Sequence, residues 1–478
     1  MGELKEKTLS GVKWNAIGRF STQGVSFVIS VLLARILSPS DYGVVGMIGI
    51  FMAIAQTFID SGFGSALIRK TDCTDEDYST AFYFNIVVGI VCYLILFICA
   101  PFIANFFDTP ILKDIVRVLS INLFLGSLTI VQGAKLTAAV DFKSQAKIGL
   151  AATVVSGCVG LIMAYSGYGV WSLVYQSVSS SLVRTILFWI VTKWRPQRTF
   201  SKQSFKYLFG FGSKILSAGL LHTIYANLTT ILIGKFYTPK DLGYYSRGEG
   251  LAVLPSSNIT GILQSVTYPI LAKVQDDDIR LISVYRKYIR ITSMVIFFGM
   301  FLMAALAKPL IITLFTDKWE SSIIYLQVFC FAYMFDHICQ LNLNILYVKG
   351  RSDLVLRLEV MKKTISIFMI VAAIPFGVLA ICISRALYTQ IAVIINTYYT
   401  GKLFDLGYVA QVKDFFKYLL FSFVAVSPAF VLSYTALSSI TILVVGGCSA
   451  CLFYWLLLRK NSDFVELLHL VFKRRKWL

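Results

Sequence analysis

Several charged and polar side chains lie inside long apolar stretches of this 478-residue sequence. In the first stretch, four of them recur at intervals of three or four residues: Arg19, Gln23, Ser26 and Ser30. A helix places residues at this spacing on one face. A charged side chain in hydrocarbon costs roughly 2.5–3.5 kcal/mol on insertion scales, so such residues usually face a bundle interior or a wet cavity. The pattern therefore predicts a hydrated path lined by polar side chains.

Arginine is the most informative residue type here, because its planar guanidinium binds phosphate through two parallel hydrogen bonds. Arg184 and Arg385 fall inside later apolar stretches, where cations outnumber acids. This balance indicates an anionic cargo. The predicted cargo-binding residues are Arg19, Gln23, Arg184, Lys214, His222 and Arg385. For uncharged residues on the same faces, hydrogen bonding between helices, worth about 0.6 kcal/mol each, is the alternative interpretation.

Acidic residues within the apolar stretches are candidates for coupling transport to an ion. Asp60 follows Gln56 by one helical turn, and Asp336 adjoins His337, so Asp60, Asp336 and His337 are the predicted coupling residues. The chain has only three histidines and carries no HExxH motif or cysteine–histidine cluster. We therefore expect no metal site, no cofactor and no catalytic site. The residues favour a protein that moves a substrate over an enzyme.

The elements that must position these side chains are transmembrane helices. The sequence is 57% hydrophobic and 14% charged, whereas a soluble domain carries roughly 25% charged residues. Apolar runs of about 20 residues, enough for a helix to cross a bilayer, recur throughout, and the alternation of a β-barrel is absent from the sequence. We predict an all-α polytopic protein with about fourteen spans, twelve being the alternative. They are placed at 14–37, 42–68, 80–104, 115–139, 146–167, 169–192, 213–235, 250–271, 288–307, 322–347, 356–375, 377–399, 416–435 and 438–458.

The charges between these spans test the helix count. With the N-terminus inside, the inner segments carry 31 of the 44 lysines and arginines and the outer segments carry 7. Lysine and arginine concentrate in cytoplasmic loops, so the asymmetry favours fourteen spans over twelve. We expect both termini in the cytoplasm of a bacterial inner membrane. The net charge of +19 then reflects topology, and we expect no nucleic-acid partner.

Two segments 200 residues apart form an internal repeat. The sequence LLARILSPSDYG at 32–43 leaves the first predicted helix, and LIGKFYTPKDLG at 232–243 leaves the seventh. Proline cannot continue the preceding helix, and an aspartate can cap the next one. The predicted structural residues of the two turns are Pro39, Asp41 and Gly43, and Pro239, Asp241 and Gly243.

The repeat divides the chain into two parallel six-helix lobes, an arrangement in which transporters bind substrate at the repeat interface. We predict an N-terminal lobe at 1–192 and a cytoplasmic linker at 193–212. A C-terminal lobe follows at 213–400. Two further helices and a basic cytoplasmic tail occupy 401–478.

Three motifs carry a family resemblance: WNAIGR at 14–19, LARILSPSDYG at 33–43 and DSGFGSALI at 60–68. They resemble the polysaccharide exporter branch of the MOP superfamily, in particular the Wzx-type colanic-acid and teichuronic-acid exporters. The resemblance implies two lobes around a cationic cavity in which Arg19 holds a diphosphate. It further implies flipping of an undecaprenyl-diphosphate-linked oligosaccharide from the cytoplasmic to the outer leaflet by alternating access, for the synthesis of capsule, exopolysaccharide or O-antigen.

Two other classes remain open. A drug/cation antiporter of the same superfamily favours acidic binding sites, whereas the spans here are rich in cations. A membrane polysaccharide polymerase or acyltransferase usually has a long loop with clustered catalytic residues, and no predicted loop exceeds about 20 residues. For the exporter, the expected partners are the lipid-linked oligosaccharide, membrane lipids, a polysaccharide polymerase and chain-length proteins.

Overall fold

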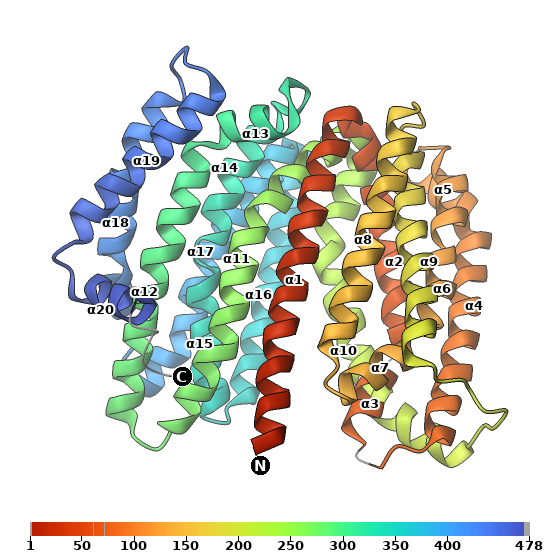
Figure 1. The fold of residues 1–478 in the computed structure, drawn as a ribbon. Coiled ribbons are helices and arrows are strands. Elements are labelled where there is room, and N and C mark those ends of the chain that lie inside the picture. The colour runs from red at the N-terminus through yellow and green to blue at the C-terminus, as the bar shows by residue number, and fades with distance from the viewer. Residues whose placement is uncertain (1, 61, 71, 473–478) are drawn as a thin grey trace. The chain divides into compact units, whose positions relative to one another are not determined.

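The computed structural model describes residues 2–60, 62–70 and 72–472, which form twenty α-helices, two short 3-10 helices and no strand (Figure 1). The first ten are α1 (Gly2–Ile36), α2 (Pro39–Asp60), α3 (Phe63–Arg69), α4 (Asp75–Phe106), α5 (Leu112–Leu119), α6 (Ile121–Ser127), α7 (Ile130–Ala138), α8 (Phe142–Tyr165), α9 (Trp171–Thr192) and α10 (Lys202–Phe236). The others are α11 (Pro239–Lys273), α12 (Asp278–Ala305), α13 (Ala307–Phe315), η1 (Asp317–Trp319), α14 (Ser322–Tyr333), α15 (Asp336–Val348), α16 (Ser352–Ala373), η2 (Ile374–Phe376), α17 (Val378–Phe404), α18 (Tyr408–Leu432), α19 (Ser439–Leu458) and α20 (Ser462–Phe472). The predicted all-α class is confirmed.

Eleven helices within the described ranges are long and apolar enough to cross a membrane. A twelfth span results if Leu112–Ser127 and Ile130–Ala138, which meet at a bend of 40°, are one crossing. The remaining predicted spans, 250–271 and 356–375, coincide with α11 and α16, which are not among these eleven. Both exceed the roughly 20 residues that a crossing needs, and α16 is charged in its first half. The count of fourteen therefore stays a prediction.

The predicted span at 115–139 is broken into α5, α6 and α7. At the second break, the Ser127 hydroxyl donates to the carbonyl of Phe124 at 2.7 Å, and the Thr129 hydroxyl donates to the carbonyl of Gly126 at 2.8 Å. Serine and threonine side chains that bond to nearby backbone compete with the helical ladder. The hydroxyls of Ser127 and Thr129 therefore account for the bend in this predicted span.

The chain divides into two compact units, Met1–Gly243 and Tyr244–Leu478. In the first unit, α1 packs on α8, α8 on α9, and α10 along α2. In the second, α12 packs on α18, α18 on α19, and α16 on α17. The first unit includes α10, which the sequence repeat assigns to the second lobe, so the packing unit and the repeat unit have different boundaries.

Small residues explain the long contact between α2 and α10. A Cβ added at Gly219 of α10 would lie 3.1 Å from the methyl group of Thr57 of α2, and one added at Gly62, just after α2, would lie 2.8 Å from the Cα atom of Gly212. The hydroxyls of Thr57 and Thr223 form a hydrogen bond of 3.1 Å across the same contact. Small and hydroxylated residues let helices approach closely in a membrane.

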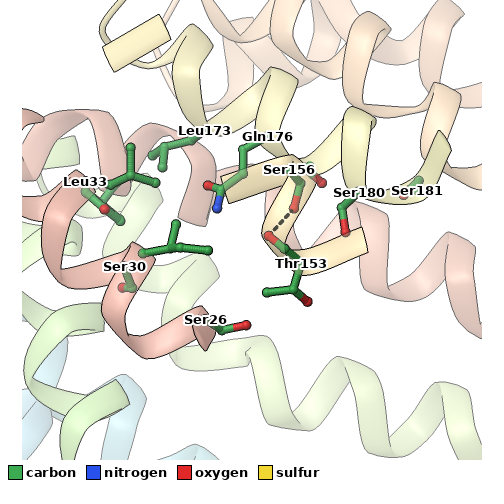
Figure 2. A pocket seen from close by; sticks show the side chains of 12 residues that line it. Ser26, Ser30, Leu33, Thr153, Ser156, Leu173, Gln176, Ser180 and Ser181 are labelled. Atoms are coloured by element: carbon green, nitrogen blue, oxygen red, sulfur yellow. Dashed lines mark hydrogen bonds between the residues drawn. The ribbon is translucent and has the colours of Figure 1, made fainter. Parts of the chain in front are cut away.

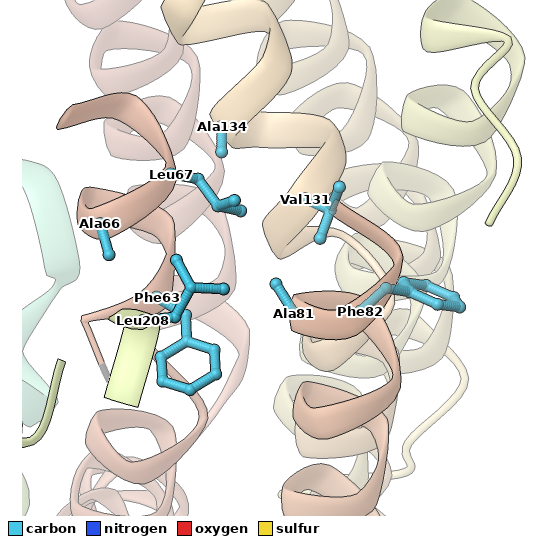
Figure 3. Packing of buried hydrophobic residues seen from close by; sticks show 8 residues of the cluster. All are labelled: Phe63, Ala66, Leu67, Ala81, Phe82, Val131, Ala134 and Leu208. Atoms are coloured by element: carbon cyan, nitrogen blue, oxygen red, sulfur yellow. The ribbon is translucent and has the colours of Figure 1, made fainter. Parts of the chain in front are cut away.

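A buried apolar cluster joins four helices of the first unit (Figure 3). Its members come from α3, α4, α7 and α10: Phe63, Ala66, Leu67, Ala81, Phe82, Val131, Ala134 and Leu208. The ring of Phe63 stacks on that of Phe84 at 4.5 Å. The cluster packs the two short helices α3 and α7 against α4 and α10. Each of these short helices follows a break within a predicted span, at 42–68 and at 115–139.

The segment between α9 and α10 is shorter than the predicted linker at 193–212, because α10 begins at Lys202. This segment lies along the start of α4. Backbone N–H groups of Gln197 and Ser201 donate to the hydroxyls of Ser79 and Thr80 at 2.9 and 3.0 Å. The Trp194 indole donates to the carboxylate of Asp75 at 3.1 Å. The connection is thus docked onto the first unit.

The two repeat turns have the same hydrogen bonds. At the start of α2, the hydroxyl and backbone N–H of Ser38 donate to the Asp41 carboxylate at 2.7 and 2.8 Å. At the start of α11, the hydroxyl and backbone N–H of Thr238 donate to the Asp241 carboxylate at 2.6 and 3.2 Å. In both turns the aspartate N–H donates back to the hydroxyl, which makes each a capping box with proline at the first helical position.

The two turns also contact each other reciprocally. A Cβ atom built on Gly43 would lie 1.6 Å from the carbonyl oxygen of Pro239, and one built on Gly243 would lie 1.9 Å from the carbonyl oxygen of Pro39. Only glycine fits at either position. The two turns thus exchange equivalent contacts within the first unit.

Candidate functional site

A cavity of about 540 Å³ lies among α2, α6, α7 and α9 of the first unit, and we call it the arginine cavity. Its lining includes one cation, one carboxylate and several amide and hydroxyl groups. The lining residues are Gln56, Asp60, Asn122, Gly126, Thr129, Ile130, Gly133, Ser181, Arg184, Thr185 and Phe188. Five of them come from α6, α7 and the bend between these helices, so the broken helix helps to form the cavity.

Arg184 and Asp60 share this cavity, although the sequence predicted different roles for them. The Gln56 amide donates to the Asp60 carboxylate at 2.9 Å, and Arg184 is close enough to interact electrostatically with Asp60. The Arg184 guanidinium also lies 5.5 Å from the centre of the Phe188 ring. A cation beside a carboxylate can exchange that partner for an anionic ligand.

A second cavity of about 340 Å³ lies among α1, α8, α9 and the start of α2, and we call it the hydroxyl cavity (Figure 2). Eight of its twelve lining residues carry a hydroxyl, one is an amide, three are aliphatic and none is charged. They are Ser26, Ile29, Ser30, Leu33, Tyr42, Thr153, Ser156, Leu173, Gln176, Ser177, Ser180 and Ser181. Ser181 lines both cavities.

Four of the predicted cargo-binding residues lie outside both cavities. Arg19 and Gln23 are on α1, and Lys214 and His222 are on α10. Gln23 is half-buried and the other three are exposed in the chain. Their role in binding stays a prediction.

Arg385 of α17 lies in the second unit and has partners within the chain. Its guanidinium forms an ion pair with Glu249 at 2.7 Å. It also donates to the hydroxyls of Tyr245 and Tyr333 at 3.1 and 2.9 Å, and the Tyr333 hydroxyl donates to Glu249 at 2.7 Å. The excess of cations over acids in the predicted spans did not indicate an acidic partner for this arginine, and Glu249 is one. Glu249 was missed because it stands one residue before the predicted span at 250–271.

Asp336 and His337 do not act as a pair in the structure. Asp336 is half-buried, and Ser256 donates to its carboxylate at a distance of 3.5 Å. His337 is fully buried, with its Nε2 atom 2.8 Å from the Ser293 hydroxyl. Adjacent residues on a helix do not face each other, so the two side chains contact different helices.

A buried lysine was missed by the sequence reasoning. Lys362 of α16 is 6% exposed and pairs with Glu359, and it interacts electrostatically with Asp336. The predicted span at 356–375 contains Lys362, which was nevertheless counted among the cytoplasmic charges. Lys362 thus interacts with Glu359 and Asp336, and Asp336 also interacts with Arg385, so charges of opposite sign alternate along this part of the second unit.

Within the described ranges, no group of three or more histidine, cysteine, aspartate or glutamate side chains is arranged to hold a metal ion. The cysteines with described side chains are free thiols.

Residues 32–324 match the family model described as "Polysaccharide biosynthesis protein". The teichuronic acid biosynthesis protein TuaB of Bacillus subtilis (strain 168) is 26% identical over 356 residues, which are 74% of each chain. The lipopolysaccharide biosynthesis protein WzxC of Escherichia coli (strain K12) is 25% identical over 383 residues, 78% of this chain and 76% of its own.

Solved structures share the fold. The lipid II flippase MurJ in an inward closed conformation superimposes with a TM-score of 0.76 at 13% identity, over 93% of this chain and 98% of its own. An inward-facing multidrug resistance MATE family transporter of the MOP superfamily gives a TM-score of 0.61 at 15% identity, over 80% and 94%.

The apolar helices and these relatives identify a multi-pass membrane protein. The resemblance that three short motifs predicted is confirmed by a match that covers more than half of the sequence. The chain belongs to the family of polysaccharide biosynthesis proteins.

Proposed function

We propose that this protein flips an undecaprenyl-diphosphate-linked oligosaccharide from the cytoplasmic to the outer leaflet of a bacterial inner membrane, by alternating access. The observation that carries the proposal is the arginine cavity, in which Arg184 lies among amide and hydroxyl groups inside a chain of this family. An arginine in a hydrated cavity suits a diphosphate, because it offers bidentate charge-assisted hydrogen bonds. Sugars cannot cross hydrocarbon unaided, and polar side chains along the path replace their water.

In this mechanism Asp60 holds Arg184 while the cavity is empty and gives way to the diphosphate when the substrate binds. The membrane potential is worth roughly 2.3 kcal/mol per charge per 100 mV. With the inside negative, it favours outward movement of the anionic lipid. Both termini then lie in the cytoplasm, the two repeats act as parallel lobes, and a polymerase with chain-length proteins receives the product outside.

The test uses Arg184→Ala, with Arg198→Ala as the matched control because Arg198 is an exposed residue of the segment between α9 and α10. In proteoliposomes with a lipid-linked oligosaccharide, the first variant should slow transfer between leaflets by about tenfold or more, the loss expected for one charge-assisted contact. The control should keep the wild-type rate. Equal rates in all three proteins, at equal protein levels, would refute the role of Arg184.

A drug/cation antiporter is the second candidate, and the carboxylate of Asp60 in the same cavity is the observation that favours it. A strain lacking the gene separates the two functions. Lipid-linked oligosaccharide accumulating on the cytoplasmic face supports flipping. Drug sensitivity with normal surface polysaccharide supports the antiporter.

A further inference from the structure

The hydroxyl cavity has a chemistry of its own. Most of its hydroxyls come from three helices: Ser26 and Ser30 from α1, Thr153 and Ser156 from α8, and Ser180 and Ser181 from α9 (Figure 2). Tyr42 of α2 adds a further one. Its volume of about 340 Å³ lies within the range of roughly 300–1,000 Å³ that small-molecule sites occupy. A polar cavity of this size inside a membrane protein is a place for water or for a polar ligand.

Close packing of helices does not explain these serines. Small residues in membrane helices usually allow neighbouring backbones to approach. Between α1 and α8 that task falls to Gly157, where an added Cβ would lie 2.1 Å from the Ile29 side chain. Between α8 and α9 the close approach falls to Gly160, where an added Cβ would lie 3.0 Å from the Gln176 side chain, while the serines border the cavity itself. The hydroxyls therefore line a void instead of filling a contact.

The hydrogen-bonding pattern fits a neutral, polyhydroxylated ligand. The hydroxyls of Thr153 and Ser156 donate to the backbone carbonyls of Gly149 and Thr153 at 2.9 and 3.1 Å, which leaves their oxygen lone pairs to accept bonds. The Gln176 amide can both donate and accept. Sugar hydroxyls also do both, while Ile29, Leu33 and Leu173 supply an aliphatic surface for the face of a sugar ring. A lining without charge is a poor match for a diphosphate or a metal ion.

The position of the cavity next to Arg184 supplies the second part of the argument. Ser181 lines both cavities, and Arg184 follows it by three residues on α9, a rise of about 4.5 Å along the helix axis. Asn122, which lines the arginine cavity, donates to Ser177 of the hydroxyl cavity at 2.9 Å. In a diphosphate-linked glycan, the first sugar is bonded directly to the diphosphate. The two cavities are adjacent in the same way.

We infer that the hydroxyl cavity binds the uncharged sugar nearest the diphosphate of the lipid-linked substrate, while the arginine cavity binds the diphosphate. This inference rests on the proposed function and assigns α1, α8 and α9 to sugar recognition. The substrate class is a prenyl diphosphate whose first sugar carries no charge.

The experiment measures binding of two probes to the purified full chain in nanodiscs: undecaprenyl diphosphate, and undecaprenyl diphosphate-glucose. The variant is Thr153→Val with Ser180→Ala, which removes two lining hydroxyls with little change of shape. The matched control is Ser179→Ala, because Ser179 lies next to Ser180 on α9 and does not line the cavity. The double variant should bind the glucose-bearing lipid about tenfold more weakly. Its affinity for undecaprenyl diphosphate should stay within twofold of wild type, which also shows that the variant is folded.

Other outcomes overturn one inference or the other. If wild type binds both lipids equally, or the double variant loses affinity for both to the same extent, the sugar site is refuted and the diphosphate site stands. If the control weakens binding of the glucose-bearing lipid as much as the double variant does, the cavity is not the site. If wild type binds neither lipid, the proposed function itself fails.

Discussion

Gly43→Ala is the substitution whose effect the structure defines most sharply. The new Cβ would lie 1.6 Å from the Pro239 carbonyl oxygen, whereas an ordinary contact starts near 3.4 Å. The two repeat turns must therefore separate by about 1.8 Å. Both sides of the contact are backbone at the start of a capped helix, so no flexible side chain can absorb the overlap.

The free-energy cost of Gly43→Ala is high because no flexible side chain can move to remove the overlap. Overpacking typically costs about 1–3 kcal/mol, and a clash between backbone atoms belongs at the upper end. At about 3 kcal/mol, the equilibrium between touching and separated turns shifts roughly 150-fold. The turns lie at the end of the helices predicted to face outward, so Gly43→Ala should favour opening at that end. Gly243→Ala should do the same, because its clash with Pro39 is equivalent.

The assay is the distance between spin labels at Ser40 and Lys240, measured by double electron–electron resonance in nanodiscs. We expect longer distances in Gly43→Ala and in Gly243→Ala. The double variant should show little further change, because the first substitution has already separated the turns. Gly49→Ala is the matched control, since an added Cβ there meets open space. A distance distribution for Gly43→Ala that matches the control would refute the reasoning.

Two further predictions concern the second unit. Glu249→Gln removes the charged partner of Arg385 and should lower the free energy of unfolding by about 2 kcal/mol or more. The double variant Glu249→Gln with Arg385→Met should recover part of this loss. Thermal unfolding in detergent measures both variants, and a single variant as stable as wild type would contradict the prediction. At Asp463 of α20, burial acts to raise the pKa of the carboxyl, but the Tyr418 hydrogen bond and the Arg290 charge outweigh it and lower that pKa below 3.8. A carboxyl whose pKa is lower in the folded state than in the unfolded state stabilises the fold at pH values above its unfolded pKa, and this stability is lost as the pH falls through its folded pKa. Amide exchange in α20, corrected for its intrinsic pH dependence, should therefore accelerate only below about pH 4. Asp463→Asn should accelerate this exchange at neutral pH as well.

Features that depend on neighbouring residues were predictable from the sequence. The repeat turns could be predicted because proline at the first helical position, with a hydroxyl and an aspartate around it, encodes a capping box by local chemistry alone. The all-helical class followed from the length of the apolar runs. The bend in the span at 115–139 also had a local signal in Ser127 and Thr129.

Features that depend on long-range packing were not predictable in this way. The place of α10 beside α2 depends on Gly219 meeting Thr57, residues 162 positions apart. Periodicity grouped Arg19 with Ser26 and Ser30, but only the two serines line a cavity with α8 and α9. For Arg385, a boundary one residue too late hid Glu249, and with it the ion pair. Span edges are the least certain part of a sequence-based assignment, and charged partners cluster there.

The reciprocal contact between the two turns constrains how the sequence can change over evolution. After a gene segment is duplicated, its copies usually drift apart, because each is selected separately. Here the backbone of each copy occupies the space that a side chain on the other copy would need. A replacement of Gly43 is tolerated only if the second copy moves away, and the same holds in reverse. The two copies therefore share one constraint, which keeps glycine at both positions.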